Sequence, residues 1–289
     1  YADEFRGGTN MTFYGIDADR KAQKLADAIF VAARRTLRQL ALPDFSETSV
    51  EIIGAESQYG CAATVIHCRE VVLKIAAKHA AAVGVGIMLR EAVGLGLATP
   101  PGLSGFAGAR PSPSPVVRLF SFALPKGTAK IQVELDGVIF DVPDTAGVAL
   151  DCEAISRPDT PAAPTGELIE VPLINLAWAR SGDKGDKSNI GVIARQPEYL
   201  PYIYAALSEQ AVFERFEHFL PAGATAETSV ERYLMPGTDA INFLIHDVLG
   251  GGGMASIRND SQGKGYGQLL LAASIPVSAE IANQVVIIK

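Results

Sequence analysis

A chain of 289 residues, 48% of them hydrophobic and 20% charged, can fill the cores of one large or two ordinary domains, and we expect two. Its formal net charge of -7 argues against a general polyanion partner such as nucleic acid, because such binding draws most of its affinity from clustered Lys and Arg. The most apolar stretch, residues 80–103, is interrupted by Arg90 and Glu91, so the sequence predicts no membrane-spanning segment.

The first half of the chain mixes strand and helix patterns. Strands are predicted at 5–16, 49–54 and 71–76, a long amphipathic helix lies between Asp17 and Pro43, and a helix rich in small residues covers 80–97. Two further strands, 116–124 and 130–142, are predicted to form a hairpin around Pro125-Lys126-Gly127. We class this part of the chain as α/β.

The clearest linker is residues 157–166, which contain three prolines and few apolar residues. We therefore divide the chain into a first domain over 1–150, a Pro-rich linker over 151–168 and a second domain over 169–289. The second domain is predicted to be a compact α+β sandwich with helices on one sheet face. Its strands are expected at 169–179, 189–195, 228–234 and 255–258, and its helices at 197–207, 208–220, 239–249 and 264–273.

An unusual polar run, RSGDKGDKSN, separates two apolar strands at residues 180–189. Its glycines permit positive φ angles and its short polar side chains can cap backbone N–H groups, so the run can hold a tight conformation. In one interpretation Arg180 and Lys184 bind an anionic group while Asp183 or Asp186 serves as acid, base or orienting partner. In the other, the run is an internally salt-bridged structural turn.

The same run offers oxygen ligands in Asp183, Asp186 and Asn189, which raises the question of a metal site. Lys184 and Lys187 lie between these residues and would repel a divalent cation, and the spacing is not that of an EF-hand. We therefore predict no metal site.

A second group of polar residues follows about sixty positions later. The helix predicted over 239–249 would place Asn242 and His246 four residues apart on one flank, where both could contact the same ligand, although a single helical His is also commonly structural. The run Gly250–Gly253 allows the backbone to approach a ligand closely, or it ends the helix with a flexible turn. Arg258 could add positive charge for a carboxylate or phosphate.

The strings SGDKGDKSNIGV and LIHDVLGGGG resemble the C-terminal domain of the acyclic terpene utilisation (AtuA-like) proteins, most strongly over 176–195 and 233–258. Residues 1 to about 142 are similar to the later part of the larger N-terminal domain of these proteins. The resemblance implies a ferredoxin-like fold for 169–289. It also implies a role in bacterial breakdown of acyclic terpenes such as citronellol and geraniol, whose intermediates are CoA thioesters.

The resemblance and the polar residues together predict a catabolic enzyme or enzyme subunit. It would act on an anionic branched acid or its CoA thioester by hydration, lyase or acyl-rearrangement chemistry. The alternative is a non-catalytic assembly or regulatory module of a larger terpenoid-degrading complex. The predicted catalytic residues are Asp183, Lys184 and His246. The predicted substrate-binding residues are Arg180, Ser181, Asn189, Asn242, Gly250, Gly251, Gly252, Gly253 and Arg258.

The expected partners and location follow from the same features. No cofactor is predicted other than CoA as part of the substrate, and the expected protein partners are the rest of the same protein or a separate subunit, and further copies of this chain. Because the chain begins at Tyr1 without a Met, we expect a fragment or a processed product. Three cysteines without C-x-x-C spacing, and no signal peptide, favour the cytoplasm.

Overall fold

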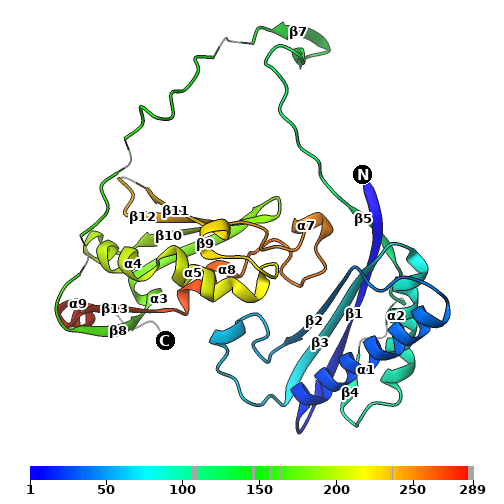
Figure 1. The fold of residues 1–289 in the computed structure, drawn as a ribbon. Helices are drawn as coiled ribbons and strands as arrows, with labels where there is room; N and C mark the ends of the chain where they lie inside the picture. The colour runs from blue at the N-terminus through cyan, green and yellow to red at the C-terminus, as the bar shows by residue number, and fades with distance from the viewer. Residues whose placement is uncertain are drawn as a thin grey trace. The chain divides into compact units, whose positions relative to one another are not determined.

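The computed structural model describes residues 1–105, 108, 110–144, 147–156, 158–162, 164–235 and 237–285. They form two compact units, one of Tyr1–Arg118 with Thr160–Lys289 and the other of Leu119–Asp159. The larger unit holds two antiparallel sheets, each with its own hydrophobic core (Figure 1). Mixed helix and sheet content is as predicted. None of the helices in the described ranges is long and apolar enough to cross a membrane.

The first sheet has the strand order β2-β3-β1-β4, and β5 also pairs with β1. Helices α1 and α2 pack side by side on one face of it (Figure 1). The apolar positions of α1, spaced by three and four residues, are buried against the sheet as the sequence predicts. The elements are β1 (Ala2–Tyr14), α1 (Ala18–Gln39), β2 (Glu47–Ile53), β3 (Glu70–His79), α2 (Ala82–Gly96), β4 (Leu103–Ser104) and β5 (Ser114–Val117), with a short 3-10 turn η1 (Gly60–Ala62).

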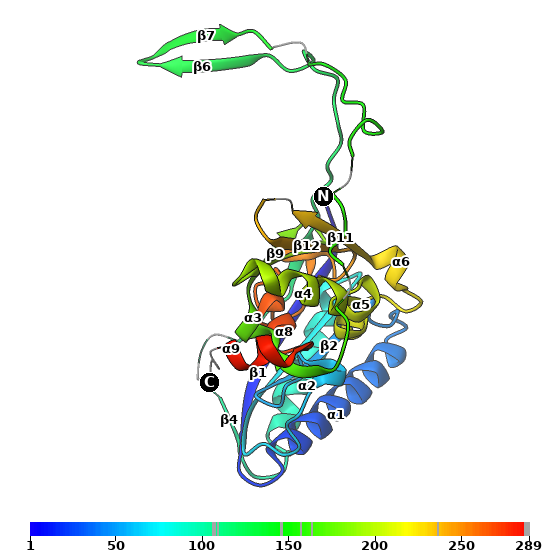
Figure 2. The same cartoon turned by 90° about the vertical axis from the view of Figure 1, so that its left-hand side faces the viewer.

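The second sheet has the order β11-β12-β10-β9, with α4, α5 and α8 gathered on one face (Figures 1 and 2). Side chains of alternate residues are buried under these helices, and the intervening ones lie on the other face. The strands are β9 (Ala177–Lys184), β10 (Lys187–Ala194), β11 (Val230–Met235) and β12 (Ala240–Ile245). The helices and 3-10 turns are α3 (Leu173–Leu176), η2 (Pro197–Tyr199), α4 (Leu200–Ala206), α5 (Glu209–Phe216), η3 (Glu217–Phe219), α6 (Ala226–Ser229), α7 (Gly252–Ala255) and α8 (Tyr266–Leu271).

A small ladder completes this part of the chain, in which β8 (Leu168–Pro172) pairs with β13 (Ser274–Ser278) before α9 (Ala279–Gln284). The boundaries predicted at 150 and 168 stay a prediction. Two residues of the predicted linker, Arg157 and Ala163, lie outside the described residues.

The unit of Leu119–Asp159 contains a two-stranded hairpin, β6 (Ile131–Leu135) with β7 (Val138–Val142). The hairpin predicted around Pro125-Lys126-Gly127 is therefore wrong. The turn is Asp136-Gly137, whose φ angles of 51° and 80° are those of a tight primed turn. Asp-Gly is a strong hairpin signal that lay inside a segment interpreted as one long strand.

The helix predicted over 239–249 is also wrong, because this segment forms β12. The apolar side chains of Ile241, Phe243 and Ile245 alternate with Asn242 and Leu244, which is the two-residue period of a strand. Ladders to β10 and β11 on both sides fix this register. His246 follows the strand directly, so Asn242 and His246 are placed by a sheet face and not by a helix flank.

The structure corrects three further predictions about the segments in and around the second sheet. The strand predicted over 169–179 is split by α3, which separates β8 from β9. The polar run is not a long loop, since β9 and β10 extend into it and leave only Gly185-Asp186 as the turn. Residues 255–258 form no strand, because α7 ends at Ala255 and the chain then continues outside the sheets.

Candidate functional site

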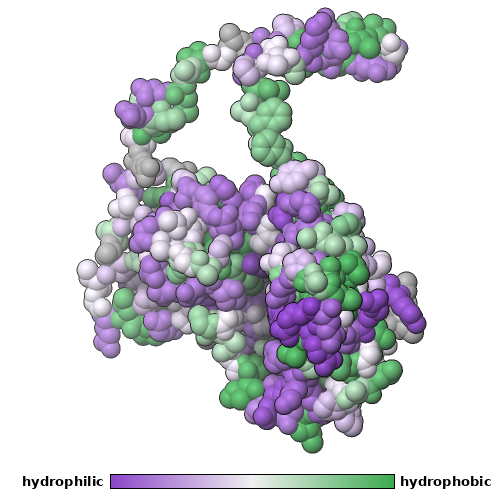
Figure 3. All heavy atoms as spheres, turned by 45° about the vertical axis from the view of Figure 1, so that its right-hand side comes forward, coloured by the Kyte–Doolittle hydropathy of each residue, from purple (hydrophilic) through white to green (hydrophobic). Residues whose placement is uncertain are grey.

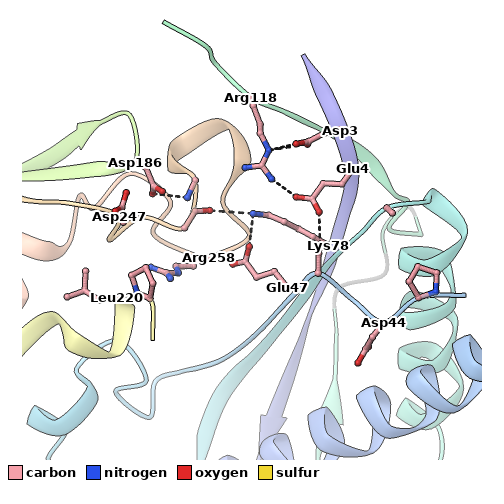
Figure 4. A pocket seen from close by; sticks show the side chains of 16 residues that line it. Asp3, Glu4, Asp44, Glu47, Lys78, Arg118, Asp186, Leu220, Asp247 and Arg258 are labelled. Atoms are coloured by element: carbon pink, nitrogen blue, oxygen red, sulfur yellow. Dashed lines mark hydrogen bonds and ion pairs between the residues drawn. The ribbon is translucent and has the colours of Figure 1, made fainter. Parts of the chain in front are cut away.

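A polar cavity of about 790 Å³ lies where the glycine run meets the ends of β1 and β3 (Figure 4). Gly250 and Gly251 form part of its wall, and Asp186 reaches it from the β9–β10 turn. The charged residues that line it are Asp3, Glu4, Asp44, Glu47, Asp186, Asp247, Lys78, Arg118 and Arg258. Six carboxylates therefore face three cations.

Two of the three cations already have carboxylate partners. The Arg118 guanidinium lies 2.8 Å from the Asp3 carboxylate and 2.6 Å from that of Glu4 (Figure 4). The Lys78 ammonium lies 2.6 Å from the Glu47 carboxylate and donates to the Gly250 carbonyl at 3.4 Å. These pairs fix the position of both side chains and leave them little net charge for a ligand.

Arg258 is the third cation, and it forms no ion pair with any described residue. Its guanidinium donates to the Val248 carbonyl at 2.5 Å and lies over the Phe219 ring at 5.6 Å from the centroid. Arg258 also forms a hydrogen bond with the Tyr266 side chain. Because its planar guanidinium carries five N–H donors, these two contacts leave donors available to a carboxylate or thioester oxygen.

Asp186 and Asp247 are the carboxylates nearest the glycine run (Figure 4). Asp186 accepts a hydrogen bond from the Gly251 N–H at 2.7 Å, which holds it in place. Asp247 has a φ of 52°, and among the described residues it has neither a hydrogen-bond nor an ion-pair partner. Asp and Asn adopt this left-handed region more readily than other residues that carry a side chain, so the backbone of Asp247 suits its residue type.

The glycine run is fastened to the β9–β10 turn by backbone contacts. The Val248 N–H donates to the Asp186 carbonyl at 3.2 Å. Gly252 has a φ of 74°, and a Cβ at this position would lie 2.3 Å from the Gly185 carbonyl oxygen. Only glycine satisfies both conditions without displacement of the turn.

A buried ion pair in the first sheet anchors the chain around Arg258. The Lys74 ammonium contacts both the Glu51 carboxylate and the Ile257 carbonyl, and burial lowers the pKa of Lys74. Glu51 also accepts from the Asn259 N–H at 3.0 Å. The backbone on either side of Arg258 is thus held by residues of β2 and β3, and its side chain is directed toward the cavity.

Five of the residues predicted from sequence share a different place, the helix-free face of the second sheet. Four of them lie in β9, β10 and β12, and the fifth directly follows β12. The register of the antiparallel ladders places all five on the same face: Arg180, Lys184, Asn189, Asn242 and His246. Arg180 faces Asn242 across Gly191, and the Asn189 amide donates to the Asn242 side-chain oxygen. His246 therefore lies on the same sheet face as Asn242, four residues further along the chain, and neither residue lines the cavity.

His246 belongs to a small polar group on this face. Its ring contacts the Glu231 carboxylate, which also accepts a hydrogen bond from the Tyr233 hydroxyl. The bonds from Tyr233 and His246 lower the pKa of Glu231. The His is thereby oriented by a carboxylate, although no cavity residue takes part.

Two other predicted residues face the helices. The Ser181 hydroxyl is buried, donates to the Gly263 carbonyl at 2.6 Å and accepts from the Gly267 N–H at 2.8 Å. Asp183 lies 3.8 Å from the Lys264 ammonium. The structure thus separates Asp183 from His246. Of the residues singled out from the sequence, Asp186, Gly250, Gly251 and Arg258 line the cavity, and Gly252 and Gly253 directly follow in the chain. The catalytic and binding roles predicted for all of them stay predictions.

The sequence patterns did not indicate that Asp247, Lys78 and Arg118 would line the cavity. Asp247 lies three residues before the glycine run, and an acidic side chain so close to this run is a sequence signal for a site residue. Lys78 and Arg118 carry no motif, since they reach the cavity only through the pairing of β3 and β5 with β1. No group of three or more His, Cys, Asp or Glu side chains suited to a metal ion occurs in the described part of the chain.

The fold and the site define a protein with two helix-covered antiparallel sheets and a polar cavity lined by residues near both of them. Residues 171–276 match the model of the AtuA ferredoxin-like domain, and residues 1–135 match that of the acyclic terpene utilisation family protein AtuA. The chain belongs to this AtuA family, which associates it with acyclic terpene utilisation. Neither the curated proteins nor the solved structures include a match to the chain.

Proposed function

We propose that the chain is a cytoplasmic enzyme, or the subunit of one, that acts on a branched acid or its CoA thioester during acyclic terpene breakdown. Family membership supports the pathway, and the free state of Cys61, Cys68 and Cys152 is in keeping with a reducing compartment. Hydration, lyase and acyl-rearrangement chemistry all require proton transfer near a carbonyl group, for which carboxylates are suitable acids and bases.

The observation that carries the proposal is the convergence of Asp247, Asp186 and Arg258 beside the glycine run in one cavity. Arg258 would bind the carbonyl or carboxylate oxygen of the substrate, and unpaired Asp247 would transfer the proton. Because six carboxylates outnumber three cations in the lining, the strongly anionic part of a CoA thioester would remain outside the cavity.

The test is turnover of CoA thioesters derived from citronellol and geraniol by Asp247→Asn. Asn tolerates the left-handed backbone of this position, so the change removes a proton-transfer group and little else. We expect kcat to fall about 100-fold or more. Asp239→Asn is the matched control, because Asp239 also has a positive φ, of 47°, but lies in the β11–β12 turn, and its turnover should be unchanged. Full activity of Asp247→Asn would refute the proposed site.

The alternative, an assembly module, is favoured by one feature of the β6–β7 hairpin. All residues of one hairpin face are apolar and between 40% and 62% exposed, namely Ile131, Val133, Leu135, Val138, Phe140 and Val142. A two-stranded hairpin is marginally stable alone. Figure 3 shows hydrophobic residues next to hydrophilic ones on this segment.

A second copy of the chain suits this face, because a wholly uncharged surface can pack against itself about a two-fold axis. Leu119, Phe120, Phe122 and Leu124 add further exposed apolar side chains to this unit. Val133→Lys should then convert dimer to monomer in light scattering, whereas Gln132→Lys on the opposite face should not. A monomeric wild-type protein would remove this alternative.

A further inference from the structure

Two adjoining cavities lie along helix α2, one of about 250 Å³ and one of about 210 Å³. They share Leu89, Val93 and Pro111 as lining residues, so they adjoin each other, and we call the pair of cavities the α2 trough. Its second cavity is lined by side chains that are apolar except for Thr9. The trough is separate from the polar cavity at the glycine run, with which it shares no lining residue.

One end of the trough carries two arginines. Arg90 and Arg110 both line the first cavity, and neither has a hydrogen-bond or ion-pair partner among the described residues. Two unneutralised guanidinium groups at the end of an apolar cavity are complementary to an anion attached to a hydrocarbon chain. A neutral apolar ligand would leave both guanidinium groups without a negatively charged partner.

The glycines of α2 supply a second, independent observation. Gly84 is required by packing, because a Cβ there would lie 2.3 Å from the His79 ring. Gly86 and Gly96 are not, since the nearest atoms to a Cβ would be Pro113 Cγ at 4.0 Å and Leu103 Cδ1 at 3.9 Å. Glycine disfavours a helix unless it has another role. Both residues line the trough, where the absence of a side chain keeps space open for a ligand.

We propose that the α2 trough binds a medium-chain carboxylate. Its carboxylate group is held by Arg90 and Arg110, and a hydrocarbon chain of about eight to ten carbons lies along Leu89 and Val93 into the second cavity. The inference does not depend on the catalytic proposal, because none of these residues touches the polar cavity.

Calorimetry of the full chain with sodium decanoate, below the concentration at which it forms micelles, tests the apolar part. Gly96→Leu fills the second cavity and should weaken decanoate binding at least tenfold. Gly94→Leu is the matched control, because a Cβ at Gly94 has no atom within 4 Å and the side chain would enter open space. Its affinity should stay within twofold of wild type. Equal effects of the two changes, or no saturable binding by the wild type, would overturn the proposal.

The charged end is tested with Arg90→Gln and Arg110→Gln. Both side chains are exposed, so the variants should fold normally, and each should weaken decanoate binding about tenfold while the double variant loses it. Decan-1-ol should bind the wild type and the double variant equally, because it is uncharged and forms no ion pair with the two arginines. If decanoate binds the double variant as tightly as the wild type, the trough is an apolar docking groove and the carboxylate assignment is wrong.

Discussion

At the scale of single residues, the Lys74–Glu51 pair connects the first sheet to the chain that carries Arg258. Both side chains are nearly buried, at 13% and 9% exposed, so the pair differs from the surface ion pairs of the chain. Removal of one partner leaves an uncompensated buried charge, which costs more than the pair itself contributes. Glu51 also accepts a hydrogen bond from the Asn259 N–H, so it both pairs with Lys74 and holds the backbone next to Arg258.

Glu51→Gln should lower the free energy of unfolding by about 3 kcal/mol, because it leaves the buried Lys74 ammonium without a carboxylate. Urea denaturation measures this directly. Arg20→Gln is the comparison, since it breaks an exposed ion pair with Asp17 at 3.8 Å and should change stability by less than about 1 kcal/mol. A similar small effect of Glu51→Gln would mean that water reaches Lys74.

His218 should make stability depend on pH. His218 as a whole is exposed to solvent, but its ring packs against Phe219 and close to Gly60, and the desolvation of the ring lowers its pKa. The unfolded chain therefore takes up a proton at this His before the folded chain does, so the contribution to stability is present above about pH 6.5 and is lost as pH falls below it. The melting temperature of the wild type should drop between pH 7.5 and 5.5. The drop should be smaller in His218→Gln, whereas replacement of exposed His67 by Gln should leave it unchanged.

At the scale of elements, the contact between the glycine run and the β9–β10 turn shapes the polar cavity. Gly252→Ala combines a positive φ with a clash against the Gly185 carbonyl, and it should destabilise the protein by about 2 kcal/mol or more. Gly253→Ala is the control, because its backbone is helical and a Cβ would meet only the flexible Gln262 side chain, at 3.3 Å. Thermal unfolding distinguishes the two, and equal melting temperatures would show that the turn can move away.

The elements also show where sequence patterns suffice and where they do not. The period of α1 predicts one helix face, and burial against the sheet follows it. The segment 240–248 fits both periods. Ile241, Leu244, Ile245 and Val248 are spaced as on a helix, whereas Ile241, Phe243 and Ile245 alternate as in a strand. Pairing with β10 and β11 on both edges decides for the strand, and no local pattern contains that information.

The candidate site was predictable only in part for a similar reason. The glycine run and Arg258 have local signals, and they do line the cavity. Arg180, Asn189 and Asn242 share one sheet face, but this face follows from strand parity and its residues do not line the cavity. Lys78 and Arg118 enter the cavity through pairing between distant strands, with partners such as Asp3 that are 115 residues away. Spacing along the chain cannot reveal such contacts.

At the scale of the whole chain, each sheet of the larger unit has a core whose buried residues come from its own half. One core uses residues between Phe13 and Ala92, and the other uses residues between Val171 and Ile281. Tyr59 of the first half packs against the second core, and several other contacts between the halves are polar, such as Arg6 to the Ser256 carbonyl at 2.7 Å and His218 to the Gln58 carbonyl at 2.9 Å. Domains with separate cores can fold alone, and contacts between them stabilise the particular segments that take part in those contacts.

Residues 160–289, produced without the rest of the chain, should therefore fold but lose order around Arg258. The Asn259 N–H has its partner in Glu51, and the Ser256 and Ile257 carbonyls have theirs in Arg6 and Lys74, so all three are missing from the fragment. Hydrogen exchange followed by mass spectrometry should show faster exchange over residues 256–260 in the fragment than in the full chain. Exchange at β10 and β12 should be unchanged, because their ladders lie inside the fragment. If residues 256–260 were equally protected in both, Arg258 would be positioned by the second domain alone, and the first sheet would contribute only charge to the cavity.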